Sequence, residues 1–205
     1  MTKMRRFYFV VEFLPKQANC ELLVGRCMSV RHSFCIQRRI QDLGVSFPHW
    51  SSASIGHSIA FIHTNFEVLN ELKNQAYFLD MEDYGNFSIS EVKPVPDNVP
   101  EVRFIRNQNI SKMFAGSAKR RLKRLAKRAA ERGEVFAPKA TDKEKTFELF
   151  HRAIAKSGSN EQEFVLHIQK EIAEGPHATG FCSYGLATNE VHRGSVPELQ
   201  LVPGD

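Results

Sequence analysis

The order of hydrophobic patterns over residues 1–96 restricts the fold more than any other feature of this sequence. Strand-like segments there are rich in aromatic and β-branched residues, and helix-like segments carry apolar residues every three or four positions. The predicted order is strand 5–14, helix 19–35, strands 43–48 and 57–63, helix 66–75 and strand 87–96. This β-α-β-β-α-β order is the signature of a ferredoxin-like domain.

A turn-rich segment, PVPDNVPEV at 94–102, separates this region from the rest of the chain. We therefore predict two domains, 1–96 and 97–205, and an α+β fold in which the smaller C-terminal domain carries a basic helix. The elements predicted in the second half are a strand over 101–108, the basic helix at 117–132, a helix at about 142–155, and strands at 164–169 and 181–187.

Cysteine spacing argues against metal and disulfide chemistry. The four cysteines are Cys20, Cys27, Cys35 and Cys182, and no two of them form a CxxC pair. We expect buried free thiols in a reducing cytoplasm, and no metal or cofactor. Because no run of 18 apolar residues occurs, we also expect no membrane span and a cytoplasmic location.

The positive charge of the chain is concentrated in residues 117–132, SAKRRLKRLAKRAAER. This segment holds eight Lys or Arg and one Glu, a formal charge of +7, whereas the whole chain carries +5 and the remainder therefore −2. A single basic element on a mildly acidic protein indicates a localised site for a polyanion. Gly133 follows at the position where a helix commonly ends.

On a helical wheel, one side of this segment carries Ala118, Leu122, Leu125 and Ala129, and the other carries Arg120, Arg124 and Lys127. Neighbouring like charges repel by about 0.2–0.5 kcal/mol per pair, and an anionic partner would relieve that repulsion. The pattern favours nucleic acid over a solvated face, since solvated faces usually mix signs. It also favours nucleic acid over an acidic membrane surface, because the apolar stripe is half alanine.

Two polar residues upstream of this helix are suited to reading bases. Arg106 and Gln108 are two positions apart on the predicted strand, so we expect both on one face. Arg forms paired hydrogen bonds with guanine, and Gln with adenine.

Several short segments, taken in order, carry a family resemblance. They are His32 followed about a dozen residues later by GVSFP at 44–48, the RxQ step at Arg106 and Gln108, the basic helix, an SxSx₄F segment at Ser157, Ser159 and Phe164, and SYGL at 183–186. Together they resemble the CRISPR repeat-processing endoribonucleases of subtype I-F. The pattern is most similar to the members encoded with transposons.

The resemblance implies a substrate, a reaction and partners. The substrate is the repeat hairpin of precursor CRISPR RNA, which is cut at its base without metal to leave a cyclic phosphate. The protein then keeps the mature guide RNA and joins the backbone and large subunits of the type I-F surveillance complex. The transposon-like branch adds transposition proteins to these partners.

The resemblance also implies roles for individual residues. His32 matches the catalytic histidine, Ser157 the serine that positions the attacking 2′-hydroxyl, and Tyr184 the tyrosine beside the site. Phe164 matches the aromatic residue that stacks on the terminal base pair, and Arg106 and Gln108 match the base-reading pair. The other RNA-binding residues implied are Lys119, Arg120, Arg121, Lys123, Arg124, Lys127, Arg128 and Ser159.

This sequence departs from the family pattern in two places. The basic segment RRLKRLAKR aligns in two registers three residues apart, which leaves the role of each arginine open. The segment after Gly185 lacks the short aromatic ending of the family.

The chemistry is possible without a metal, because RNA supplies its own nucleophile in the 2′-hydroxyl. A histidine, whose ordinary pKa is about 6.5, can contribute acid–base catalysis of roughly 10²–10⁴-fold. Three hypotheses remain open from the sequence: a metal-independent RNA endonuclease, a catalytically silent subunit that binds an RNA hairpin, and a DNA-binding assembly protein.

Overall fold

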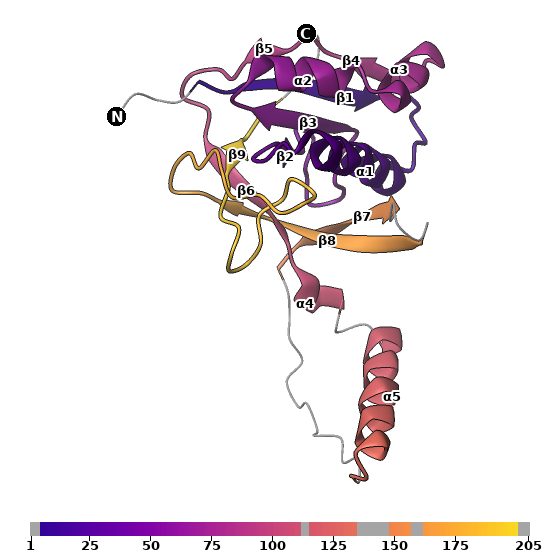
Figure 1. Cartoon of the computed structure of the whole chain (residues 1–205). Helices are drawn as coiled ribbons and strands as arrows, with labels where there is room; N and C mark the ends of the chain where they lie inside the picture. The colour runs from indigo at the N-terminus through magenta and orange to yellow at the C-terminus, as the bar shows by residue number, and fades with distance from the viewer. Residues whose placement is uncertain (1–4, 112–114, 135–147, 157–161, 201–205) are drawn as a thin grey trace.

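The computed structural model describes residues 5–111, 115–134, 148–156 and 162–200, and within the basic helix it describes side chains from residue 123 onward. The strands lie in two antiparallel sheets (Figure 1). The elements are β1 Phe7–Phe13, α1 Cys20–Arg38, β2 Gly44–Ser46, β3 Ser58–His63, α2 Phe66–Lys73, α3 Ala76–Asp83, β4 Phe87–Ile89, β5 Lys93–Pro94, β6 Glu101–Arg106, α4 Gln108–Ser111, α5 Ala115–Glu131, β7 Phe150–Lys156, β8 Glu163–Ile172 and β9 Val196–Pro197.

The first sheet has the strand order β2-β3-β1-β4, with β5 also paired to β1. Together with α1 and α2, this order confirms the predicted ferredoxin-like arrangement. The prediction missed α3, which begins three residues after α2 ends. Its Phe78 is fully buried and packs edge-on against Phe9 and Phe61, so α3 covers part of the same core.

The second sheet has the order β7-β8-β6-β9, and it corrects the helix predicted at 142–155. Residues 150–155 of that range belong to β7, which ends at Lys156, while 142–147 lie outside the described residues. Ala153 and Ala155 are fully buried and alternate with more exposed neighbours, as in a strand with one face against a core. Pairing with β8 along the whole of β7 outweighs the helical propensity of alanine.

Helix α1 lies between the two sheets (Figure 1). Gly25 allows the close approach, because a Cβ atom there would collide with the carbonyl group of Ile154 in β7. One turn later, the Ser29 hydroxyl donates to the Gly25 carbonyl at 2.9 Å and accepts from the Lys156 amide at 3.2 Å. The glycine that weakens the helix pattern in the sequence is therefore a contact point between helix and strand.

The segment at 181–187, predicted as a strand, is a turn that meets β6 through one bridge from Ala187 to Ile105. Gly185 has a φ of +77°, which strand residues do not adopt, and its amide donates to the Cys182 carbonyl at 2.8 Å. The chain reverses there and places Tyr184 beside α1.

The division at residues 96 and 97 stays a prediction. Several contacts cross it: Arg6 forms an ion pair with Glu101 that is almost fully buried, and the Ser46 hydroxyl donates to the Pro197 carbonyl at 3.2 Å. The second half thus packs closely on the first sheet.

Helix α5 stands apart from both sheets and follows α4 (Figure 1). The prediction of a helix here is confirmed, and Gly133, with a φ of +70°, lies just beyond its end as expected. Among the described residues, no helix has the length and apolar character needed to cross a membrane.

Candidate functional site

His32 on α1 and Tyr184 in the turn at 181–187 stack on each other. Their ring centroids are 4.6 Å apart and the rings are inclined by only 19°. The two residues are 152 positions apart in the chain, so only the packing of the turn on α1 brings them together. Of the residues predicted as catalytic, these two lie side by side.

A hydrogen bond fixes the orientation of the His32 ring. Its Nδ1 lies 2.7 Å from the Ser183 carbonyl oxygen, which can only accept, so Nδ1 carries the hydrogen. The neutral ring then holds its lone pair on Nε2. An imidazole oriented in this way can take up or release a proton at Nε2.

Arg31 also donates to the Ser183 carbonyl and is a site residue that the sequence analysis missed. Its guanidinium donates to the Ser183 carbonyl at 2.7 Å and to the Leu43 carbonyl. Only 3% of Arg31 is exposed, and in the described part of the chain no group accepts from its Nε. The available signal was its spacing, since Arg31 falls four residues from both Cys27 and Cys35 on the apolar face of the helix.

Phe164 at the start of β8 and Arg106 at the end of β6 surround Tyr184. The Phe164 ring meets the tyrosine edge-on at 5.6 Å, and the Arg106 guanidinium carbon lies 5.7 Å from the centre of the tyrosine ring. Burial raises the pKa of Tyr184 above its ordinary value, although Arg106 opposes the shift. Tyr184 therefore keeps its proton at neutral pH and can donate a hydrogen bond.

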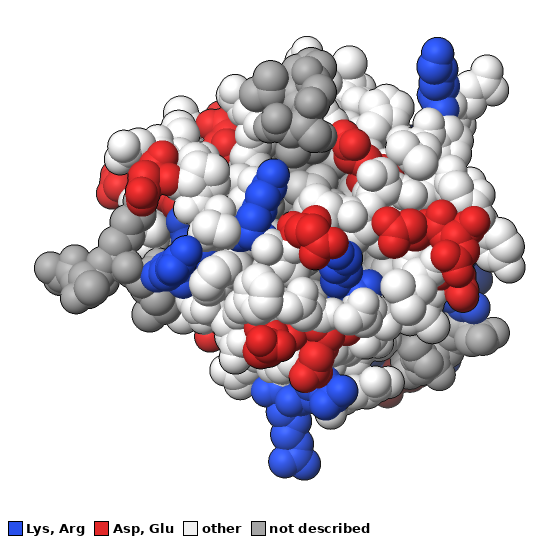
Figure 2. Space-filling model, turned by 90° about the horizontal axis from the view of Figure 1, so that it is seen from above, with Lys and Arg blue, Asp and Glu red and all other residues white. Residues whose placement is uncertain are grey.

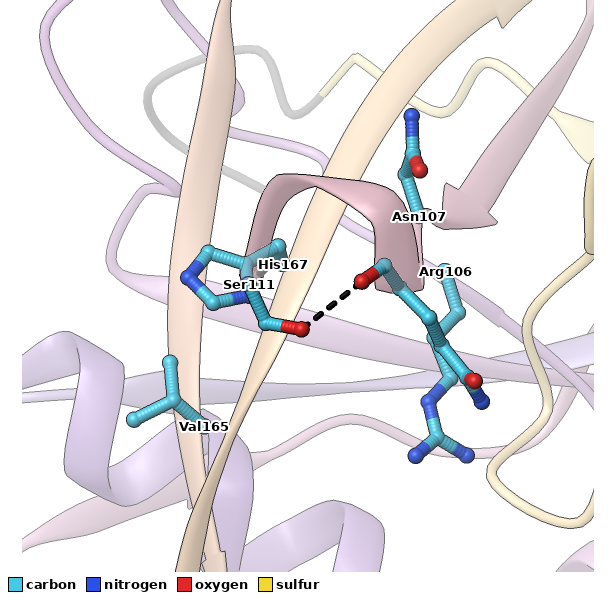
Figure 3. Close-up of a pocket in the computed structure, with 6 residues that line it drawn as sticks. Arg106, Asn107, Ser111, Val165 and His167 are labelled. Atoms are coloured by element: carbon cyan, nitrogen blue, oxygen red, sulfur yellow. Dashed lines mark hydrogen bonds between the residues drawn. The ribbon is translucent and has the colours of Figure 1, made fainter. Parts of the chain in front are cut away.

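Arg106 and Gln108 line one pocket of about 260 Å³ together with Asn107, Ser111, Val165 and His167 (Figure 3). The prediction that both lie on one strand is wrong, because β6 ends at Arg106 and Gln108 begins α4. The Ser111 hydroxyl donates to the Gln108 carbonyl at 2.7 Å, the bond dashed in Figure 3. The start of α4, rather than strand alternation, brings the two residues to one pocket.

His167 forms the buried wall of this pocket. Burial lowers its pKa, and Arg152 adds to the shift, so the ring is neutral at neutral pH. Asn107, another lining residue, donates from its side-chain amide to the Gln169 side chain at 2.7 Å. Asn107 and His167 thus fix the C-terminal end of β6, and the Gln108 side chain beyond it stays exposed.

The basic side chains of α5 that the structure describes are exposed: Lys123, Arg124, Lys127 and Arg128. Ala129, on the apolar stripe, is buried, whereas Leu125 is 43% exposed. By contrast, acidic and basic groups are interspersed on the face that carries α2 and α3 (Figure 2). This arrangement agrees with a localised polyanion site on α5.

Several predicted residues cannot be placed in this site. Ser157 and Ser159 lie outside the described residues, as do the side chains of Lys119, Arg120 and Arg121. Within the described ranges, no group of three or more His, Cys, Asp or Glu residues could hold a metal ion. The four cysteines are free thiols, with Cys27, Cys35 and Cys182 buried.

An oriented histidine, a pocket lined by Arg and Gln, and an exposed basic helix on an α+β scaffold are features expected of a protein of the nucleic-acid-processing class. Residues 8–199 match the family model of the CRISPR-associated proteins Cas_Csy4, and the chain belongs to this family. The match confirms the resemblance to the type I-F CRISPR repeat-processing endoribonucleases. A comparison with curated proteins finds no match.

Proposed function

We propose that this protein cleaves the repeat hairpin of precursor CRISPR RNA at its base, without a metal ion, through attack by the adjacent 2′-hydroxyl. The observation that carries the proposal is the hydrogen bond from His32 Nδ1 to the Ser183 carbonyl, since it leaves Nε2 as the available base. Family membership supports the RNA substrate and the endonuclease class.

In the proposed reaction, the 2′-oxygen bonds to phosphorus and the bond from phosphorus to the 5′-oxygen breaks. His32 takes the proton of the 2′-hydroxyl, a solvent water donates one proton to the leaving 5′-oxygen, and the imidazolium then returns its proton to solvent, so the proton count balances. The products are a 2′,3′-cyclic phosphate and a free 5′-hydroxyl. No external nucleophile or redox partner is needed.

The remaining residues position the RNA in this proposal. Ser157 orients the 2′-hydroxyl, Tyr184 donates to the phosphate region, and Phe164 stacks on the terminal base pair. Arg106 and Gln108 read bases at the lower end of the hairpin. The contacts of Phe164 and Arg106 with Tyr184 support this assignment, because Tyr184 stacks on His32 and so these two side chains lie close to it.

The basic face of α5 would hold the hairpin through its phosphates, which supply most of the affinity in such interfaces. After cleavage the protein would keep the guide RNA and act as a subunit of the type I-F surveillance complex in the cytoplasm. Transposition proteins are further proposed partners, through the similarity to the transposon-encoded branch.

The test uses the cognate repeat hairpin RNA in EDTA, beside a copy with hydrogen in place of the 2′-hydroxyl at the cut site. We expect the native RNA to be cut to a cyclic phosphate and the deoxy copy to be bound but left whole. Tight binding without any cleavage would instead identify a catalytically silent subunit, and equal affinity for duplex DNA would favour a DNA-binding protein.

A further inference from the structure

A larger cavity, of about 530 Å³, adjoins His32 away from the Arg106 pocket. It shares His32 and Ser183 with the site and extends along the C-terminal half of α1 to Ile36, Asp42, Phe181 and His192. Arg106 and Gln108 do not line it, since they line the pocket of Figure 3. The proposed function leaves this cavity unused.

The stereochemistry of the proposed cleavage requires space of this kind. In an in-line displacement the attacking 2′-oxygen and the leaving 5′-oxygen stand on opposite sides of the phosphorus. The 2′-oxygen belongs to the hairpin, which lies toward Phe164 and Arg106 in the proposed complex. The nucleotide that carries the leaving 5′-oxygen must therefore lie across the scissile phosphate from the hairpin, near His32 but away from Phe164 and Arg106.

We infer that this cavity binds the nucleotide on the 3′ side of the cut, and that it prefers a base with an exocyclic amino group over uracil. The inference rests on the proposed function, because it takes the scissile phosphate to lie at His32. The cavity volume is within the range of about 300–1,000 Å³ that is common for small-ligand sites.

The apolar part of the cavity suits the face of a base. Ile36 is 63% exposed, although its neighbours Phe34 and Cys35 are buried. The Phe181 ring packs against Gly44 and Gly194, where an added Cβ would come within 2.8 Å and 2.6 Å of ring carbons. This packing fixes the position of the ring. Stacking on an aromatic ring is a common way to bind unpaired bases.

The polar part of the cavity accounts for the base preference. Asp42 Oδ1 accepts from the Gly180 amide at 2.8 Å, which orients the carboxylate. A carboxylate can only accept, so it favours an amino group such as N4 of cytosine over the O4 carbonyl of uracil. Asp42 has a φ of +62°, a conformation that asparagine also tolerates. Asp42→Asn would keep the bond to Gly180 and present an amide donor instead.

The experiment compares repeat hairpin RNAs that differ only in the first nucleotide after the cut: cytidine, uridine or an abasic residue. We expect the single-turnover cleavage rate to fall about tenfold for the abasic RNA, in line with the loss of one stacked base. We also expect cytidine to be cut faster than uridine by the native protein, and Asp42→Asn to remove or reverse this order. The affinity for the cleaved hairpin should stay the same.

Ile36→Ala supplies an independent measurement, with Ile172→Ala as its matched control. Ile172 is 87% exposed and does not line the cavity. Ile36→Ala should slow cleavage of the cytidine RNA and reduce the further loss caused by the abasic residue, because both changes remove the same contact. Ile172→Ala should leave both rates unchanged.

Equal rates for all three RNAs would overturn the inference while leaving the proposed function intact. The same loss from an abasic residue one position further downstream would also overturn it, since the effect would then not belong to this cavity. Failure of the native protein to cut any of the RNAs would overturn the proposed function and the inference with it.

Discussion

At the scale of the residue, the Ser183 carbonyl is the central group, because it accepts from both His32 Nδ1 and Arg31. The buried guanidinium of Arg31 also holds Leu43, so it joins α1 to the turn that carries Tyr184 and to the segment before β2. Arg31 thus acts on the site through its neighbours, as a positioning residue.

Arg31→Met should slow single-turnover cleavage by roughly 10–100-fold, because a small displacement of a reacting group can cost that much. Hairpin affinity should remain close to that of the native protein. Arg31→Lys should give an intermediate rate, since a single ammonium group does not reproduce the planar fork of a guanidinium. Quenched-flow cleavage with excess protein measures these rates.

Arg103→Met is the matched control, because Arg103 is also buried but bonds to Arg193 and Glu171 outside the site. It should lower the melting temperature without changing the cleavage rate. An equal loss of rate in the two variants would show that Arg31 contributes only to folding.

The pairing of His32 with Tyr184 could be predicted from the sequence only through the family resemblance. Neither local pattern indicates the other residue, because the stack depends on the positive φ of Gly185. The burial of Arg31, by contrast, was open to prediction, since a charge in the apolar stripe of a helix needs buried acceptors. The identity of its acceptors could not be predicted, because they are backbone carbonyls of residues that lie elsewhere in the chain.

At the scale of the element, hydrophobic periodicity was enough for the first sheet and failed at β7. The alanines at 153 and 155 fit either a helix or a strand, and the choice depends on pairing with β8 and on contact with α1. The contact with α1 is possible because Gly25 lets the helix approach the backbone of β7 closely. A glycine in a helical pattern was therefore a packing signal.

Gly25→Ala should destabilise the protein by roughly 1–3 kcal/mol, the usual cost of an added methylene in a well-packed interior. The reason is the collision of the new Cβ with the Ile154 carbonyl, which forces α1 and β7 apart. Urea denaturation measures the change in the free energy of unfolding. Gly175→Ala is the control, because an added Cβ meets nothing within 4 Å there, and it should be close to neutral.

Replacing Lys123, Arg124 and Lys127 on α5 with glutamine should weaken hairpin binding. Each lost phosphate contact should reduce the slope of log affinity against log salt by about 0.7–0.9. Titrations at several salt concentrations measure this slope. The control carries the same change at exposed basic residues elsewhere: Lys16, Arg38 and Lys93. A slope that falls equally in both variants would mean that α5 is not the main phosphate-binding element.

At the scale of the whole molecule, the site is assembled from both sheets. His32 comes from α1, Arg106 from β6, Phe164 from β8 and Tyr184 from the turn at 181–187. The ion pair of Arg6 with Glu101 and the bond from Ser195 to Glu101 tie the segment after this turn to both sheets. The sequence predicted the ferredoxin-like topology, but not that the second sheet would share α1 with the first.

The most direct test of the central claim is cleavage of the cognate repeat hairpin by His32→Ala in EDTA, with affinity measured in parallel. The account predicts that cleavage is lost while binding is kept, and that His57→Ala, a change at an exposed histidine away from the site, cuts at the native rate. Cleavage at the native rate by His32→Ala would contradict the account.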